Sequence, residues 1–85
     1  MKLAVEITLY PLCDDYIPVI QDFIERLNKD DRLSVKTSDT CTLVSGDYDH
    51  LMATLSTEFK QTYQQVGQAA FVCKFLNATN MQLSA

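Results

Sequence analysis

Three cysteines and one histidine are the side chains in this 85-residue chain most able to do covalent or metal chemistry. Cys13, Cys41 and Cys73 are odd in number and form no C-x-x-C pair. With the single histidine, His50, they give no spacing typical of a zinc site. The favoured interpretation is that the cysteines are reduced, small apolar residues and that His50 is a surface residue. A nucleophilic pair of Cys13 or Cys41 with His50 stays open, and fast alkylation near neutral pH would reveal it.

Composition disfavours several classes of function. Gly46 and Gly67 are the only glycines, and no glycine loop that could cradle a phosphate is present. The formal charge is −4, and the seven basic residues are scattered, which disfavours nucleic-acid binding. No apolar run approaches the length of a membrane span, and the first residues are too short a run for a signal sequence. We therefore expect a non-enzymatic cytoplasmic protein that binds neither nucleic acid nor membrane and uses no cofactor or metal.

Segment 10–16, YPLCDDY, is a corner where the sequence pattern changes. Up to Leu9 apolar residues alternate with polar ones, as in a strand, and from Ile17 they recur at three- and four-residue spacing, as in a helix. Asp14 or Asp15 can cap this helix by accepting its first free N–H groups, or the corner can be the rim of a binding site. Taken alone, the capped helix start is favoured, because acidic caps are common.

This corner connects two of six predicted elements. Strands are predicted at 3–10, 33–37, 40–46 and 69–77, and helices from about 17 to 27 and from 48 to 66. Pro18 fits the first helix only in its first turn, Asp47 can cap the second helix, and Gly67 can end it. The order β-α-β-β-α-β predicts a ferredoxin-like α+β sandwich. In this fold a four-stranded antiparallel sheet of order 4-1-3-2 carries both helices on one face.

Strand alternation divides the side chains between the two faces of this sheet. Odd-numbered positions are predicted to face the helices, and even-numbered positions to lie on the open face. The predicted core comprises Leu3, Val5, Ile7, Leu9, Leu33, Val35, Cys41, Leu43, Phe71, Cys73 and Phe75, with Ile17, Ile20, Phe23, Ile24 and Leu27 of the first helix. The predicted open face comprises Glu6, Thr8, Tyr10, Lys36, Thr42, Val44, Val72, Lys74 and Leu76. Because this face includes apolar side chains, we expect a partner sheet or a ligand to cover it.

Length and even composition indicate one domain, residues 1–77, with residues 78–85 as a C-terminal tail. A domain of this size buries only about two-thirds of the surface that its unfolded chain exposes, so association with a second copy would stabilise it. The fold class by itself does not decide the function, because ferredoxin-like domains include enzymes, binding modules and regulatory sensors.

Three segments carry a resemblance to a known family: ITLYPLCDDYIPVI at 7–20, VKTSDTCTLVSGDYDHLM at 35–52, and FVCKFLN at 71–77. Its most specific part is Leu9-Tyr10-Pro11 and Asp14-Asp15-Tyr16, with Lys36-Thr37, Thr42 and Gly46-x-x-Asp49-His50 further on. These motifs resemble the YkoF-like family of thiamine and hydroxymethylpyrimidine binding proteins. The resemblance implies a small-molecule binder of the predicted fold, acting without chemistry in vitamin uptake or salvage. It also implies assembly, since single-unit members associate into dimers or higher oligomers.

The candidate ligand-binding residues are Glu6, Thr8, Tyr10, Lys36, Thr37, Ser38, Thr40 and Thr42. Those at positions 10, 36, 37 and 42 match the family motif, whereas segment 38–41 departs from it. Glu6 and Thr8 are included because they should lie beside Thr42 on the open face. There a carboxylate can offset the cationic ring of a thiamine-like ligand, and hydroxyls can bind its aminopyrimidine. A cross-strand pair of Glu6 with a lysine, or packing of Tyr10 at a subunit interface, is equally open.

Two functions from different classes follow. The first is binding of thiamine or its hydroxymethylpyrimidine moiety by a homodimer or homotetramer whose open sheet faces meet and frame the pockets. The alternative is an oligomeric regulatory or assembly module whose open face makes only protein contacts. A thermal-shift measurement with thiamine separates them, because a ligand that binds only the folded state raises the melting temperature.

Overall fold

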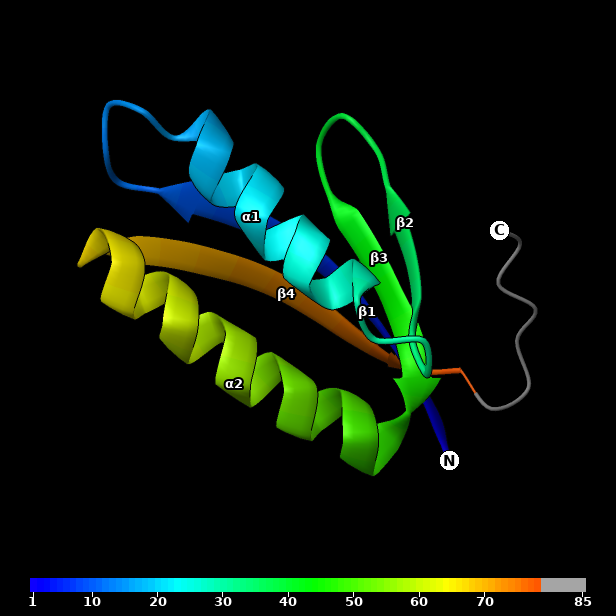
Figure 1. The fold of residues 1–85 in the computed structure, drawn as a ribbon. Coiled ribbons are helices and arrows are strands. Elements are labelled where there is room, and N and C mark those ends of the chain that lie inside the picture. The colour runs from blue at the N-terminus through cyan, green and yellow to red at the C-terminus, as the bar shows by residue number, and fades with distance from the viewer. Residues whose placement is uncertain (79–85) are drawn as a thin grey trace.

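Six elements in the predicted order build the protein, for which a computed structural model describes residues 1–78 (Figure 1). The strands are β1 (Lys2–Pro11), β2 (Ser34–Thr37), β3 (Thr42–Asp47) and β4 (Ala69–Asn77), and the helices are α1 (Ile17–Asn28) and α2 (Tyr48–Val66). The strands form one antiparallel sheet in the order β2-β3-β1-β4, which is the predicted order taken from the other edge. Both helices lie on the same face of this sheet (Figure 1). The ferredoxin-like prediction is confirmed.

β1 forms the centre of the core because it is paired along both of its edges. Its side chains Leu3, Val5, Ile7 and Leu9 are buried beneath the helices, as the alternation predicts. They pack with Phe23 and Leu27 of α1, Val44 of β3, and Leu51 and Leu55 of α2. Each such side chain contributes about 1.5–3 kcal/mol when it is fully buried, so this cluster is the main stabilising feature of the fold.

The predicted faces of β3 are wrong, because its even-numbered residues point toward the helices. Val44 lies opposite Val5, and Thr42 lies opposite Ile7. Residues directly opposite each other in an antiparallel pair share a face of the sheet. Thr42 and Val44 are therefore buried inner residues, and Leu43 lies on the open face.

The loop between β2 and β3 determines which residues of β3 share a face of the sheet with those of β2. Thr37 pairs with Thr42, so residues 38–41 form a four-residue loop in place of the predicted turn at 38–39. A loop with an even number of residues pairs odd-numbered positions with even-numbered ones, as Val35 with Val44 shows. The predicted two-residue turn at 38–39 is also even, so it too is incompatible with equal parity in both strands, which needs an odd number of loop residues. Cys41, predicted in the core, is part of this loop and is half-buried.

α1 begins without the predicted acidic cap. Its N-cap residue is Tyr16, and no side chain makes a capping hydrogen bond there, so capping by Asp14 or Asp15 is contradicted. Pro18 lies in the first turn, as predicted, where its missing N–H has no helical partner to lose. Ile17 was predicted in the inner stripe but is 54% exposed, because this first turn extends past the core.

α2 has both of its predicted ends. The Asp47 side chain accepts a hydrogen bond from the His50 backbone N–H at 3.1 Å. Gly67 follows the last turn with a φ of 78°, a backbone conformation that residues other than glycine rarely adopt. Leu51 and Leu55, four residues apart, are buried on the face that covers the sheet.

The two helices are joined by Arg26, whose side chain is only 9% exposed. Its guanidinium donates to the Glu58 carboxylate at 2.9 Å and to the Thr62 hydroxyl at 2.6 Å, both on α2. It also pairs with Asp22 on its own helix at 3.1 Å. The position of α1 on the sheet therefore depends on polar bonds to α2 as well as on apolar packing.

At the C-terminal end of the described chain, the Ala78 N–H donates to the Lys2 carbonyl at 2.9 Å, and Ala78 is buried. The rest of the predicted tail, 79–85, lies outside the described residues. Phe75 of β4, predicted in the core, is 50% exposed because β4 is an edge strand. Neither described helix is long and apolar enough to cross a membrane.

Candidate functional site

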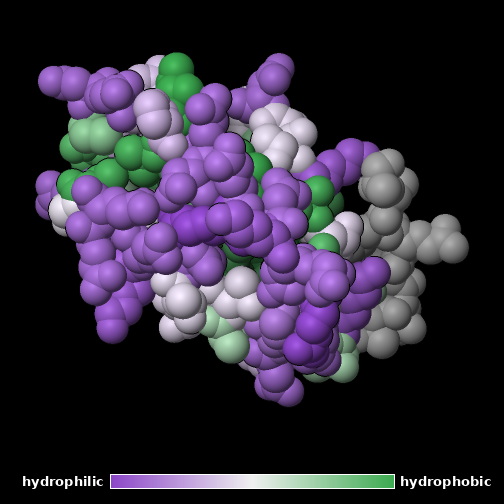
Figure 2. All heavy atoms as spheres, in the orientation of Figure 1, coloured by the Kyte–Doolittle hydropathy of each residue, from purple (hydrophilic) through white to green (hydrophobic). Residues whose placement is uncertain are grey.

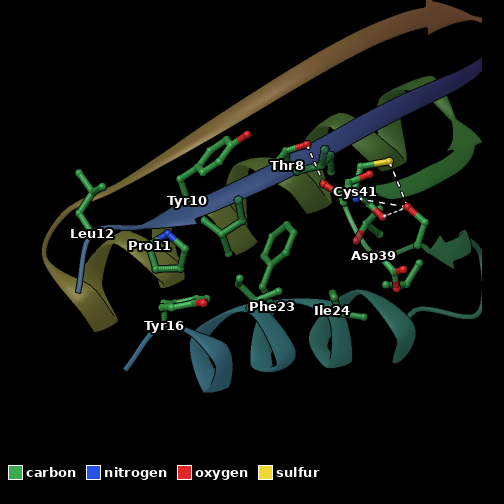
Figure 3. Close-up of a pocket in the computed structure, with 16 residues that line it drawn as sticks. Thr8, Tyr10, Pro11, Leu12, Tyr16, Phe23, Ile24, Asp39 and Cys41 are labelled. Atoms are coloured by element: carbon green, nitrogen blue, oxygen red, sulfur yellow. Dashed lines mark hydrogen bonds between the residues drawn. The ribbon is translucent and has the colours of Figure 1, made fainter. Parts of the chain in front are cut away.

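A pocket lies between α1, the C-terminal half of β1 and the loop that joins β2 to β3 (Figure 3). Its volume is about 540 Å³. Small-molecule sites commonly span roughly 300–1,000 Å³, so the pocket can hold a ligand of two aromatic rings. The described residues that line it are Ile7, Thr8, Leu9, Tyr10, Pro11, Leu12, Tyr16, Ile20, Phe23, Ile24, Thr37, Ser38, Asp39, Thr40, Cys41 and Thr42. About half of them are apolar or aromatic, which favours burial of a flat ring.

The α1 wall of the pocket is apolar and aromatic. Tyr16, Ile20 and Ile24 are four residues apart and so lie along one side of the helix, with Phe23 beside them (Figure 3). Phe23 is 2% exposed, and its ring packs against Phe71 at a centroid distance of 5.2 Å. Because the core holds Phe23 in place, this wall is preformed in the absence of a ligand.

The opposite wall is the β2–β3 loop, which is closed by its own hydrogen bonds. The Ser38 hydroxyl donates to the Cys41 carbonyl at 3.1 Å and accepts from the Cys41 N–H at 3.3 Å. The Thr8 hydroxyl donates to the Thr40 carbonyl at 3.2 Å, which ties the loop to β1 (Figure 3). These bonds fix the loop backbone although the side chains of residues 38–40 are exposed.

Polar groups gather at one end of the pocket. Asp39 is the only charged residue among the described lining residues, and Thr37 and Thr42 supply hydroxyls on the helix-facing side of the sheet. Tyr16 and Asp39 lie at opposite ends of the pocket (Figure 3). The pocket thus has an aromatic end at the start of α1 and an acidic, hydroxyl-rich end at the loop.

Hydrophobic side chains also surround the aromatic end on the outside of the molecule. Leu12, Tyr16 and Ile17 are 60%, 50% and 54% exposed. Figure 2 shows hydrophobic atoms gathered around the start of α1, on a face that is otherwise largely hydrophilic. An apolar rim of this kind favours entry of an aromatic ligand at this end.

The pocket brings together six of the eight predicted ligand-binding residues, but Thr37 and Thr42 lie on the helix-facing side of the sheet and not on the open face. Those six are Thr8, Tyr10, Thr37, Ser38, Thr40 and Thr42. The ring of Tyr10 extends away from α1, so this residue lines the pocket chiefly with its backbone (Figure 3). Glu6 and Lys36 are outside the pocket, since both lie opposite Leu43 on the open face. Whether any of the eight contacts a ligand stays a prediction.

Sequence reasoning missed the α1 wall and the acidic group of the loop. Tyr16, Ile20 and Ile24 are spaced like core residues, so periodicity assigned the two isoleucines to the core. The available signal was that Tyr16, an aromatic residue of the corner, continues the four-residue spacing of Ile20 and Ile24 beyond the helix start. Asp39 was treated as a turn residue, because nothing in the chain itself shows that its loop folds toward α1.

The structure separates Cys41 from His50 and makes the thiol of Cys73 less reactive. His50 is half-buried, not a plain surface residue, and its Nε2 lies 2.6 Å from Asp30 Oδ2. Cys41 precedes β3 and His50 follows it, and the two ends of a six-residue strand are roughly 17 Å apart. Burial raises the pKa of the Cys73 thiol, which disfavours the reactive thiolate. No group of metal-binding side chains occurs within residues 1–78.

Comparison with protein families gives one match over nearly all of the described chain. The model of the YKOF-related family matches residues 2–78. A comparison with curated proteins gives no match.

Several solved structures share the fold. A protein from Streptococcus pneumoniae has a TM-score of 0.84 at 21% identity, and the match covers 94% of this chain and 90% of that one. A protein from Thermotoga maritima, whose name proposes a role in thiamine biosynthesis or salvage, has a TM-score of 0.84 at 16% identity, with 98% and 90% covered. A hypothetical protein from Methanocaldococcus jannascii has a TM-score of 0.78 at 20% identity, with 95% and 84% covered. At these identities the likeness establishes the shared fold.

Proposed function

The chain belongs to the YKOF-related family, and on this premise we propose that it binds thiamine or its hydroxymethylpyrimidine moiety, without catalysis, in cytoplasmic vitamin uptake or salvage. The observation that carries the proposal is the pocket between α1 and the β2–β3 loop, with its aromatic wall and its hydroxyl-rich end. The structural neighbour from Thermotoga maritima, with its thiamine-related name, supports the same class of ligand.

The pocket matches the chemistry of this ligand in two ways. Thiamine joins an aminopyrimidine to a positively charged thiazolium, so it needs apolar surface for two rings and polar partners at their edges. Tyr16, which is 50% exposed, offers a ring face that can attract a cation or another aromatic group, and Ile20 and Ile24 offer apolar surface beside it. Thr37 and Thr42 offer hydroxyls that can both donate to and accept from an aminopyrimidine.

The site proposed here lies within one copy of the chain. The hypothesis drawn from the sequence places the ligand between the open sheet faces of two copies, with Glu6 as its carboxylate partner. Glu6 lies opposite Lys74 and Leu43 on that open face, whereas Thr42 faces the helices and lines the pocket. These two residues therefore distinguish the two locations.

Calorimetric titration of thiamine into the wild type and two variants tests the location. We expect Thr42→Val to weaken binding by about five- to tenfold, since it removes one hydrogen bond while keeping the side-chain shape. We expect Glu6→Ala to leave the affinity unchanged. The reverse pattern would return the site to the open face. If neither thiamine nor hydroxymethylpyrimidine raises the melting temperature of the wild type, the proposed function is wrong.

The open face of the sheet favours a second candidate function, homo-oligomeric assembly through that face. Tyr10, Val72 and Leu76 are 54%, 59% and 46% exposed, and register puts Tyr10 and Val72 on this face. An exposed set of large apolar side chains is typical of a contact surface. β4, which carries Val72 and Leu76, is an edge strand of the described sheet, and its free edge can pair with another chain.

Sedimentation of the wild type and Val72→Lys tests this assembly. We expect the wild type to sediment as a dimer or tetramer and the variant as a monomer, because a buried unpaired charge opposes association. A wild type that is monomeric at all concentrations would remove this candidate. Thiamine binding by a monomeric variant would show that the pocket does not require the assembly.

A further inference from the structure

We propose that Asp39 makes the pocket selective for a cationic ligand that carries no phosphate group. This inference rests on the proposed function and names the form of the ligand: free thiamine in preference to its phosphate esters. It depends on the charges that border the pocket and on the way the β2–β3 loop is held.

The loop holds Asp39 at the pocket. Its neighbour Ser38 bonds twice to Cys41, and the next residue, Thr40, accepts from Thr8 at 3.2 Å. Asp39 is thus at the tip of a loop whose two sides are both tied down, and it lines the hydroxyl-rich end of the pocket. The Asp39 side chain is exposed, so its carboxylate can approach a ligand cation directly.

The described lining of the pocket has no positively charged side chain that could hold a phosphate. No lysine or arginine occurs among its described lining residues. Phosphate sites are usually formed by such side chains or by free N–H groups at a helix N-terminus. The nearest helix start, that of α1, has Pro18 in its first turn, which removes one of the N–H groups that such a start can offer to an anion.

Acidic residues also precede the other end of the pocket in the sequence, although they do not line it. Asp14 and Asp15 come directly before Tyr16, the lining residue at the start of α1, and none of the three makes a capping bond to the helix. A doubly charged phosphate ester at the hydroxyl-rich end of the pocket would therefore meet the Asp39 carboxylate. A thiazolium at the acidic end would meet an opposite charge.

Calorimetry with three probes and three variants tests the selectivity. The probes are thiamine, thiamine monophosphate and hydroxymethylpyrimidine, titrated at slightly alkaline pH, where the last is largely uncharged. The variants are Asp39→Asn, Asp39→Lys and the control Glu6→Gln. Asn removes the charge and keeps the shape, Lys reverses the charge, and the control makes the same charge change on the open face. Melting temperatures confirm that each variant is folded.

We expect the wild type to bind thiamine at least tenfold more tightly than its monophosphate. Asp39→Asn should weaken thiamine binding about fivefold at low salt, as for an exposed ion pair, and leave hydroxymethylpyrimidine unaffected. Asp39→Lys should bind the monophosphate at least as tightly as thiamine. Added salt should reduce the wild-type preference, and Glu6→Gln should match the wild type.

Two kinds of failure can be told apart. If the wild type binds thiamine and its monophosphate equally, or if Asp39→Asn weakens all three probes alike, the selectivity is wrong and the proposed function stands. An equal loss in Glu6→Gln also overturns it, since the effect would then follow net charge alone. If the wild type binds none of the three probes, the proposed function itself fails, and the selectivity fails with it.

Discussion

Replacing Arg26 with Met tests whether the polar bonds between the helices hold the pocket wall in place. The Arg26 guanidinium donates to the Glu58 carboxylate at 2.9 Å and to the Thr62 hydroxyl at 2.6 Å, and the Thr62 hydroxyl has no other side-chain partner within residues 1–78. Methionine keeps most of the aliphatic length of arginine, so Arg26→Met removes the bonds while retaining much of the apolar packing.

The expected loss of stability follows from the burial of the groups left behind. Thr62 is fully buried, so its hydroxyl loses a partner that water cannot easily replace, at a cost of about 1–3 kcal/mol. The Glu58 side chain is 18% exposed and can turn to water, which limits its share. We therefore expect Arg26→Met to lower the free energy of unfolding by about 2 kcal/mol, which is roughly 10 °C in melting temperature for a domain of this size.

Urea unfolding followed by circular dichroism measures this change. A second substitution gives the control: Thr62→Val removes the orphaned hydroxyl, so the double variant should recover about 1 kcal/mol of the loss. A cost below about 0.5 kcal/mol for Arg26→Met, as at an ordinary surface site, would refute the reasoning. In that case apolar packing alone would determine the position of α1 and of the pocket wall that it forms.

Two further predictions concern other parts of the fold. Burial by itself raises the pKa of Asp30, but hydrogen bonds from the Arg32 N–H, His50 and Thr54, with the charge of His50, lower it below its ordinary value. The ionised Asp30 carboxylate thus stabilises the fold above its unfolded pKa of about 3.9, and this contribution is lost as pH falls through the lower folded pKa. The urea midpoint of Asp30→Asn should therefore vary less with pH in this range than that of the wild type. Gly67→Ala should cost about 1 kcal/mol in urea unfolding, because φ is 78° there, although no atom lies within 4 Å of the added Cβ; an unchanged midpoint would contradict this.

Local sequence signals were sufficient for most of the fold. The alternation from Leu3 to Leu9 predicted a central strand with one buried face, and Asp47 and Gly67 predicted both ends of α2. These signals work because side-chain direction and helix ends are set by near neighbours in the chain. The order of the elements then left few arrangements that right-handed connections allow.

The faces of β3 and the start of α1 did not follow from local signals. Thr42 and Val44 have the same local pattern whichever face they occupy, and only pairing with Ile7 and Val5 decides it. At the start of α1, Asp14 and Asp15 are good caps by type, yet the chain path makes Tyr16 the cap residue. In both places the local sequence allowed two outcomes, and the path of the chain or its pairing with a distant segment selected one.

By itself, the sequence determined the six elements, their order, the central place of β1 and the likeness to a thiamine-related family, because these depend on periodicity, caps and motifs within short segments. Only the tertiary structure decided that Asp39 and Thr42 meet the α1 wall beneath the sheet while Glu6 lies on the other side. The physical reason is register: adjacent residues of a strand point to opposite faces, so a shift of one residue moves a side chain across the sheet.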